Sequence, residues 1–226
     1  MLTVTPKKSG ESAKEYALRV LLENIVSVNL APGDKIVEHD ICSALGLSRT
    51  PCREAELELA RRKLITIQPK RGTFVSYIDP ALVEEVRALR SVLEKEVSRL
   101  ACKRLTASHV DSLWENVTIW EMYIRRGDEK KIFFLDKKFH KMLYAGCGCN
   151  YWYELIESVA PHFDRTTVLS FKCRLTEHVE RDHIDLLKAI ERGDEEEAVA
   201  VTARHMDRYI QNAATIRSAF PDYFLK

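Results

Sequence analysis

The stretch Leu47-Ser-Arg-Thr-Pro-Cys-Arg-Glu-Ala55 carries the strongest local signals in this chain of 226 residues. Ser48 is a good N-cap, because its side-chain oxygen can accept a hydrogen bond from an unpaired N–H of the first helical turn. Pro51 falls in that turn, where its missing N–H costs nothing. The stretch therefore predicts the start of a helix, which we expect to run to about Lys63.

Two helical segments precede this stretch and two strand-like segments follow it. Apolar residues at helical spacing predict a helix over 12–28, and a short helix over 38–45 ends at Gly46, in the position after a helix that favours glycine. The segments Leu64-Ile-Thr-Ile-Gln68 and Thr73-Phe-Val-Ser-Tyr77 alternate like the strands of a hairpin. Three helices closed by a two-stranded hairpin is the order of a winged helix-turn-helix.

Beyond residue 78 the sequence shows helical signals and no strand signals. We expect six helices, over residues 79–100, 106–126, 128–145, 151–170, 176–192 and 194–217. Helices of this length joined by short turns favour one antiparallel bundle. The expected fold is mostly α, with a winged helix-turn-helix domain over residues 1–78 and an all-α domain over residues 79–226.

Charge is distributed unevenly along the chain, whose net charge is only +1. Residues 1–78 hold 12 Lys and Arg against 9 Asp and Glu, whereas the remainder holds 23 against 25. This distribution is typical of a protein that touches phosphates with one end only.

The sequence gives no sign of export or of a membrane partner. No apolar run reaches the roughly 18–20 residues that cross a bilayer, and the first residues lack the apolar stretch of a secretory signal. The six cysteines follow no disulfide or zinc-finger spacing, which favours a reducing compartment. We therefore expect a cytoplasmic protein.

Seven residues of the N-terminal domain are candidates for DNA contact. They are Ser48, Arg49, Thr50, Arg53, Lys70, Arg71 and Gly72. Arg49 and Arg53 lie one helical turn apart, so both guanidinium groups can reach guanine edges or phosphates in the major groove. The basic tip of the hairpin, residues 70–72, is small enough to approach the adjacent minor groove. The alternative is an ordinary solvated basic face.

Residues 47–55, the pair Leu64-Ile65 and the segment Pro69–Val75 together resemble the GntR family of bacterial transcription regulators. The resemblance covers the whole N-terminal domain. It departs from the family at Glu56, where an apolar residue is usual, and at Lys63, where glycine is usual. The resemblance implies a homodimer that binds a near-palindromic DNA operator, and repression is the expected sign of control.

Residues 80–215 resemble the all-helical FCD ligand domain of the FadR-type branch of that family. The resemblance rests on Arg90-x-x-Leu-Glu94, Asp136-x-x-x-His140, Gly148-x-Asn150, Asp182-His183, Ala189-Ile190, Gly193-Asp194 and Arg204-His205. In metal-binding members the matching aspartate and three histidines hold a divalent cation. The implied ligands here are Asp136, His140, His183 and His205.

Helical spacing also predicts that these four side chains face inward. Asp136 and His140 stand four residues apart, so one helix face presents a carboxylate and an imidazole together. His183 and His205 fall on apolar faces, whereas Asp182 falls on a solvated face with His178. An ordinary buried histidine is the alternative at each position. A set of three nitrogens and one oxygen with open positions suits Zn²⁺, Ni²⁺ or Mn²⁺.

A small organic acid is the effector that the resemblance implies. Arg90 is expected to clamp its carboxylate, and the alternative for Arg90 is an ion pair with Glu94, four residues on. His162 and Arg165 are further candidates for lining the pocket. A regulator that responds to the metal alone, or a metal-dependent hydrolase, are the competing functions. Because no obvious general base or nucleophile accompanies the metal ligands, we expect no enzymatic activity.

Overall fold

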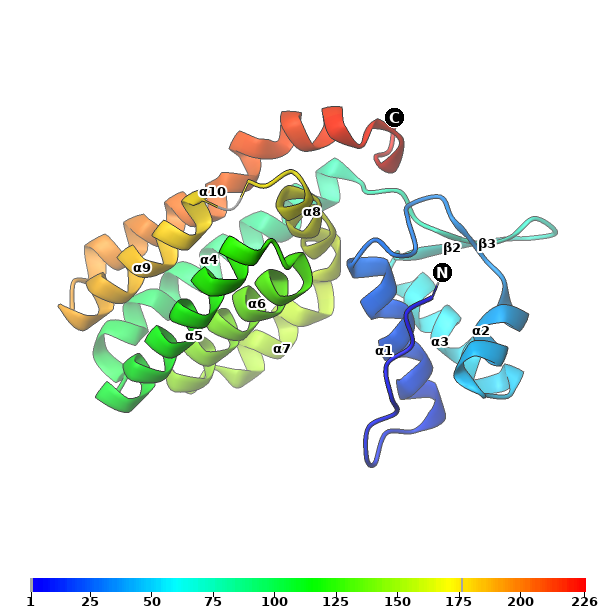
Figure 1. The fold of residues 1–226 in the computed structure, drawn as a ribbon, viewed down its shortest axis with the longest axis horizontal. Helices are drawn as coiled ribbons and strands as arrows, with labels where there is room; N and C mark the ends of the chain where they lie inside the picture. Colours follow the sequence, from blue (N-terminus) through cyan, green and yellow to red (C-terminus); the bar gives the residue numbers. More distant parts are fainter. Residues whose placement is uncertain (1, 176) are drawn as a thin grey trace. The chain divides into compact units, whose positions relative to one another are not determined.

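The computed structural model describes residues 2–175 and 177–226 (Figure 1). The chain forms two compact units. One unit extends to Pro80 and also contains Phe220–Lys226, and the other spans Ala81–Ala219. The first boundary lies close to the expected one at residues 78 and 79.

The C-terminal segment was expected in the helical domain but belongs to the N-terminal unit. The N–H of Ile78 donates to the carbonyl of Tyr223 at 2.9 Å, and the N–H of Leu225 donates to the carbonyl of Ile78 at 2.9 Å. Ile78 and Phe224 form this parallel bridge with both side chains buried. The physical reason for the difference is this backbone pairing, which joins residues far apart in the sequence.

The N-terminal unit has three helices and a small antiparallel sheet among its described residues (Figure 1). The elements are α1 (Ala13–Val26), β1 (Lys35–Ile36), α2 (Glu38–Leu45), α3 (Arg49–Arg61), β2 (Ile65–Gln68) and β3 (Gly72–Val75). The sheet order is β1-β3-β2, so the expected two-stranded hairpin gains a third strand. Strand β1 pairs with Phe74 and Thr73 of β3 and was missed because two residues carry no alternation signal.

The core of this unit forms between α1, α3 and the sheet, where Leu21, Leu59 and Leu64 are fully buried. Lys63 lies between α3 and β2 with a φ of 58°, in the left-handed region that favours glycine. Glycine, which the resemblance implies at this position, would adopt this conformation without strain. This chain makes the same turn with a lysine.

The helical unit contains seven helices in the part of the chain that the structure describes (Figure 1). They are α4 (Pro80–Arg104), α5 (Ala107–Arg126), α6 (Glu129–Gly146), α7 (Asn150–Val159), α8 (Pro161–Lys172), α9 (Glu177–Glu191) and α10 (Glu195–Ala219). Six were expected, and the helix predicted over 151–170 is two. Pro161 begins α8. Because proline has no backbone N–H, it cannot donate the hydrogen bond that would continue α7. Thr176, the predicted start of the next helix, lies outside the described residues.

The bundle core brings together the helices that carry the candidate ligands. Val97 of α4, Phe139 of α6, Leu187 of α9 and Val201 of α10 are all buried in one cluster. Phe139 of this core stacks on the ring of His183, with 4.2 Å between the ring centres, so the core borders the candidate ligands. No helix among the described residues combines the length and apolar character that crossing a membrane requires.

Candidate metal centre and nucleic-acid interface

The first turn of α3 presents its basic side chains to solvent. The side chains of Arg49 and Arg53 are 82% and 72% exposed, and each has a nitrogen near Glu38 of α2, at 3.8 and 3.9 Å. Exposed ion pairs of this length contribute little to stability, so a phosphate can replace Glu38 at small cost. Ser48 is the N-cap as predicted, but its hydroxyl makes no capping hydrogen bond. That hydroxyl can therefore bind an external acceptor.

The wing tip is also basic and exposed. Lys70 has a φ of 63° and Gly72 a φ of 124°, so the chain reverses through two left-handed residues. A Cβ atom on Gly72 would lie 3.0 Å from the Cε of Lys35, closer than side-chain carbons normally approach. The glycine thus keeps the turn tight, and the exposed side chains of Lys70 and Arg71 project at its tip.

Four candidate metal ligands meet inside the helical unit. Asp136 and His140 come from α6, His183 from α9 and His205 from α10. Each residue offers one ligand atom, and these four atoms all lie within 4.8 Å of one another. The His183 Nε2 atom is 3.6 Å from the Oδ1 atom of Asp136, which is too long for a hydrogen bond.

Several nitrogens of this cluster are buried without hydrogen-bond partners among the described residues. These atoms are Nε2 of His140, both ring nitrogens of His183 and Nδ1 of His205. Unpaired polar atoms in a protein interior are costly, and a bound cation would satisfy the lone pairs that face the cluster. Burial, and then the neighbouring imidazoles of His205 and His140, lower the pKa of His183 well below its usual range. His183 is therefore neutral, which is the form that ligates metals.

Two carboxylates stand behind the histidines. The Oε2 atom of Glu94 lies 3.0 Å from Nδ1 of His140, and its Oε1 atom accepts from a guanidinium nitrogen of Arg90 at 3.3 Å. Burial alone would raise the pKa of Glu94, but His140 and Arg90 lower it to about 2. On the far side of the cluster, Oδ2 of Asp182 lies 3.8 Å from Nδ1 of His205.

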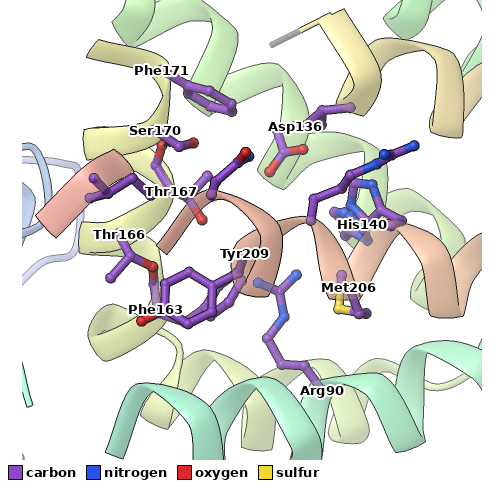
Figure 2. Close-up of a pocket in the computed structure, with 15 residues that line it drawn as sticks. Arg90, Asp136, His140, Phe163, Thr166, Thr167, Ser170, Phe171, Met206 and Tyr209 are labelled. Carbon is purple, nitrogen blue, oxygen red and sulfur yellow. Dashed lines mark hydrogen bonds between the residues drawn. The ribbon is translucent and has the colours of Figure 1, made fainter. Parts of the chain in front are cut away.

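A cavity of about 50 Å³ adjoins the cluster (Figure 2). Figure 2 shows Arg90 of α4 and Asp136 of α6 pointing toward one another across it, with Phe163 and Tyr209 beside them. One water needs roughly 10–15 Å³ of such volume, so the space admits a molecule of a few heavy atoms. Arg90 lines the cavity together with three of the four candidate ligands, Asp136, His140 and His205. A buried guanidinium therefore shares this space with those ligands.

Two family models match this chain. The FCD domain model matches residues 85–208, and the model described as bacterial regulatory proteins, gntR family, matches residues 15–75. The chain belongs to the GntR family. It is a DNA-binding transcription regulator of the GntR type with an FCD domain, which confirms the resemblance and the fold class predicted from the sequence.

Individual proteins of this family resemble the chain over its whole length. It is 28% identical over 225 residues to the HTH-type transcriptional repressor RspR of Escherichia coli K12, with 99% of each chain covered. It is 30% identical over 207 residues to the HTH-type transcriptional regulator YdfH of Escherichia coli O6:H1, with 91% of each covered. The solved structure of E. coli McbR/YncC shares the fold, with a TM-score of 0.79 at 21% identity over 92% of this chain and 99% of that chain.

This GntR-family chain has a buried carboxyl at Glu56, where the resemblance implies an apolar residue. Glu56 is 5% exposed, and its Oε2 atom accepts a long hydrogen bond of 3.5 Å from the hydroxyl of Thr73 on β3. Its Oε1 atom has no partner among the described residues. Burial, and then the charge of Glu38, raises the pKa of Glu56.

Asp182 was expected on a solvated face, and that expectation is wrong. The side chain is 1% exposed, because Arg204 and Arg208 of α10 donate hydrogen bonds to it at 2.7 and 2.9 Å and cover it. Burial would raise the pKa of Asp182, but His205, Arg208 and Arg204 lower it below its usual range. His178 is exposed, as expected.

His162 and Arg165 are buried in α8 but do not line the cavity, contrary to expectation. The residues of α8 that line it are Phe163, Thr166, Thr167, Ser170 and Phe171. Four of them follow the spacing i, i+3, i+4 and i+7 of a single helix face. That periodicity was the signal available in the sequence, and it points His162 and Arg165 elsewhere.

Proposed function

We propose that this GntR-family protein is a repressor whose operator affinity is controlled by a small organic acid bound at a divalent metal ion. One observation carries the proposal: four ligand atoms from three helices converge beside a cavity that a buried arginine also lines. The name of the E. coli relative, a transcriptional repressor, supports the sign of control.

Asp136, His140, His183 and His205 would hold the ion. The donor set of three imidazoles and one carboxylate suits Zn²⁺, Ni²⁺ or Mn²⁺. When bound, the ion supplies Lewis-acid positions for the oxygens of a carboxylate. The cluster lacks an obvious general base or nucleophile, so binding rather than hydrolysis is the function that this donor set supports.

Arg90 would bind the carboxylate of the acid from the opposite side. Arg90 is 5% exposed, and its Nε atom has no hydrogen-bond partner among the described residues. The Cζ atom of its guanidinium lies 5.1 Å from the ring centre of Phe163. A guanidinium can donate two parallel hydrogen bonds to one carboxylate, and burial strengthens them. The cavity beside Arg90 accommodates an acid of a few heavy atoms.

The N-terminal unit would bind DNA through α3 and the wing. The contacting residues would be Ser48, Arg49, Thr50, Arg53, Lys70, Arg71 and Gly72. In a homodimer, two copies of α3 would enter successive major grooves of a near-palindromic operator.

Control requires that the acid bind two states of the protein with different affinities. Helix α10 is a candidate to connect those states to DNA binding, because His205 and Tyr209 line the cavity from this helix. The chain then continues from α10 into Phe220–Lys226, which pairs with Ile78 in the N-terminal unit. A shift of α10 would thus pull directly on a segment of that unit.

A thermal-shift screen tests the proposal. Small carboxylates are added to wild-type protein loaded with Zn²⁺, Ni²⁺ or Mn²⁺, beside the His205→Ala variant. We expect at least one acid to raise the melting temperature of the wild type alone. If metal stabilises the wild type but no acid adds to this, control by an acid is refuted, and the metal is structural or is itself the signal. If no metal shifts the wild type, the proposal is wrong.

A further inference from the structure

Glu94 is a buried carboxylate that lies between the candidate metal ligand His140 and Arg90. It is 2% exposed, it is not one of the four clustered ligands, and it does not line the cavity. Its two carboxylate oxygens have different partners. Oε2 lies 3.0 Å from Nδ1 of His140, and Oε1 lies 3.3 Å from a guanidinium nitrogen of Arg90.

This arrangement selects one tautomer of His140. An ionised carboxylate can only accept hydrogen bonds, so the proton of a neutral His140 must sit on Nδ1. The other nitrogen, Nε2, then carries a lone pair. Nε2 is buried and has no hydrogen-bond partner among the described residues. The ring is therefore set to offer its lone pair to the cluster formed with Asp136, His183 and His205.

Arg90 in turn fixes the orientation of Glu94. The guanidinium is a donor only, and it occupies the carboxylate oxygen that His140 leaves free. Both side chains lie on α4, four residues apart, so the helix itself holds them in register. Arg90, Glu94 and His140 thus form a continuous chain of polar contacts from the cavity to the cluster.

We propose that Glu94 is a positioning residue that fixes the metal-binding tautomer of His140 and is itself held in place by Arg90. This inference rests on the proposed function, since it assigns Glu94 a role at the same metal site. Carboxylates behind metal-ligating histidines orient the ring and raise its basicity, and their loss typically costs about 10–100-fold in metal affinity.

Glu94→Gln is the sharpest variant, because glutamine keeps the shape but cannot make both contacts. If its oxygen faces His140, its NH₂ group faces the guanidinium of Arg90, donor against donor. If the amide is reversed, its NH₂ donates to Nδ1 of His140 and moves the ring proton to Nε2, the nitrogen that faces the cluster. The matched control is Glu96→Gln, on the same helix, where the glutamate is exposed and pairs with Arg99.

Two measurements test the inference. The first is zinc affinity, from competition with a chromogenic chelator; we expect a loss of about 10–100-fold for Glu94→Gln and none for Glu96→Gln. The second is the tautomer of His140 in metal-free protein at pH 8, from two-bond ¹⁵N–¹H correlations, with the signal identified by its loss in His140→Ala. We expect the Nδ1–H form in the wild type and a shift toward the Nε2–H form in Glu94→Gln.

The outcomes separate this inference from the proposed function. If the wild type binds no zinc, nickel or manganese, the proposed function fails. If the wild type binds zinc and Glu94→Gln binds it equally well with an unchanged tautomer, only the role of Glu94 is refuted. Should Glu94→Gln fail to fold, the wild-type spectrum still decides, because the Nε2–H form of His140 would overturn the inference.

Discussion

For Arg90 the sequence leaves two alternatives, an ion pair with Glu94 and a clamp for the carboxylate of the effector. It pairs with Glu94, as the alternative predicts, and it also lines the cavity beside the four clustered candidate ligands. Its binding of a carboxylate stays a prediction. Substitution of lysine keeps the positive charge but removes the planar fork that binds a carboxylate through two hydrogen bonds. We predict that Arg90→Lys weakens binding of the acid found by the screen at least tenfold.

Isothermal titration of that acid into zinc-loaded protein measures the effect. The control is Arg87→Lys, one turn earlier on α4, whose arginine pairs with Glu84 and Asp207 outside the cavity. Equal acid affinity in Arg90→Lys and the wild type would contradict the clamp.

Glu56 has a raised pKa, which gives a stability prediction with a definite sign. A carboxyl whose folded pKa lies above its unfolded value of about 4.5 binds more protons in the folded state. The N-terminal unit therefore loses stability as the pH rises from the unfolded pKa of Glu56 through its folded pKa. Above the folded pKa the carboxylate is ionised, and its burial lowers the free energy of unfolding by the full desolvation cost. We predict that Glu56→Leu raises the free energy of unfolding at pH 8 by about 1–3 kcal/mol.

Urea unfolding followed by circular dichroism at pH 8 and pH 5 checks this prediction. The gain in Glu56→Leu should be smaller at pH 5 than at pH 8, because the raised pKa favours the neutral carboxyl in the folded state as the pH falls. A stability loss at pH 8, or a gain that grows as the pH falls, would show that the carboxyl of Glu56 contributes favourably.

At the scale of elements, the pair α9 and α10 is joined by one buried carboxylate. Asp182 of α9 accepts hydrogen bonds from Arg204 and Arg208 of α10. Asparagine would keep the size but lose the charge, and hydrogen bonds between charged groups are worth about 1.5–3 kcal/mol. We predict that Asp182→Asn destabilises the metal-free protein by an amount of this order, measured by thermal unfolding.

The matched control lies on the same helix. Asp185 also accepts a hydrogen bond from Arg204, at 2.7 Å, but in an exposed position. Because exposed ion pairs contribute about 0–1 kcal/mol, Asp185→Asn should change stability little. Equal effects of the two substitutions would refute the structural role assigned to the burial of Asp182.

The elements themselves differ in how far the sequence predicts them. Most helices and the hairpin follow from local signals, such as Gly46 after α2 and Pro51 in the first turn of α3. Strand β1 has two residues, and its pairing with β3 depends on residues more than 35 positions away. The pairing of Ile78 with the C-terminal segment has the same cause, since no local pattern encodes a partner so distant.

The candidate site shows the same division. The resemblance to the FCD domain is what selects Asp136, His140, His183 and His205. Helical periodicity adds that these side chains lie on the inward faces of α6, α9 and α10. The partner of His140 was not predictable in this way, because Glu94 is 46 residues away on another helix. The predicted exposure of Asp182 was wrong, because polar neighbours on its own helix indicate a solvated face. The arginines that bury this carboxylate come from another helix, α10.

At the scale of the whole molecule, two units must act on one another for the protein to be a switch. The cavity and the four clustered candidate ligands lie within the helical unit, and the basic surface of α3 and the wing lies within the other. The chain passes between the units twice, once before α4 and once after α10. Both of these helices contribute residues to the cavity, so each connection continues into a helix that lines the proposed effector site.

The most direct test is an operator titration. An operator is first selected from random duplex DNA, and its affinity is then measured by fluorescence anisotropy at one salt concentration, with metal and acid added singly and together. We predict that the acid lowers operator affinity at least fivefold in metal-loaded wild-type protein, and that His205→Ala shows no response to the acid. Operator affinity that is unchanged by the acid, or that changes equally in His205→Ala, would contradict control by an acid bound at the metal.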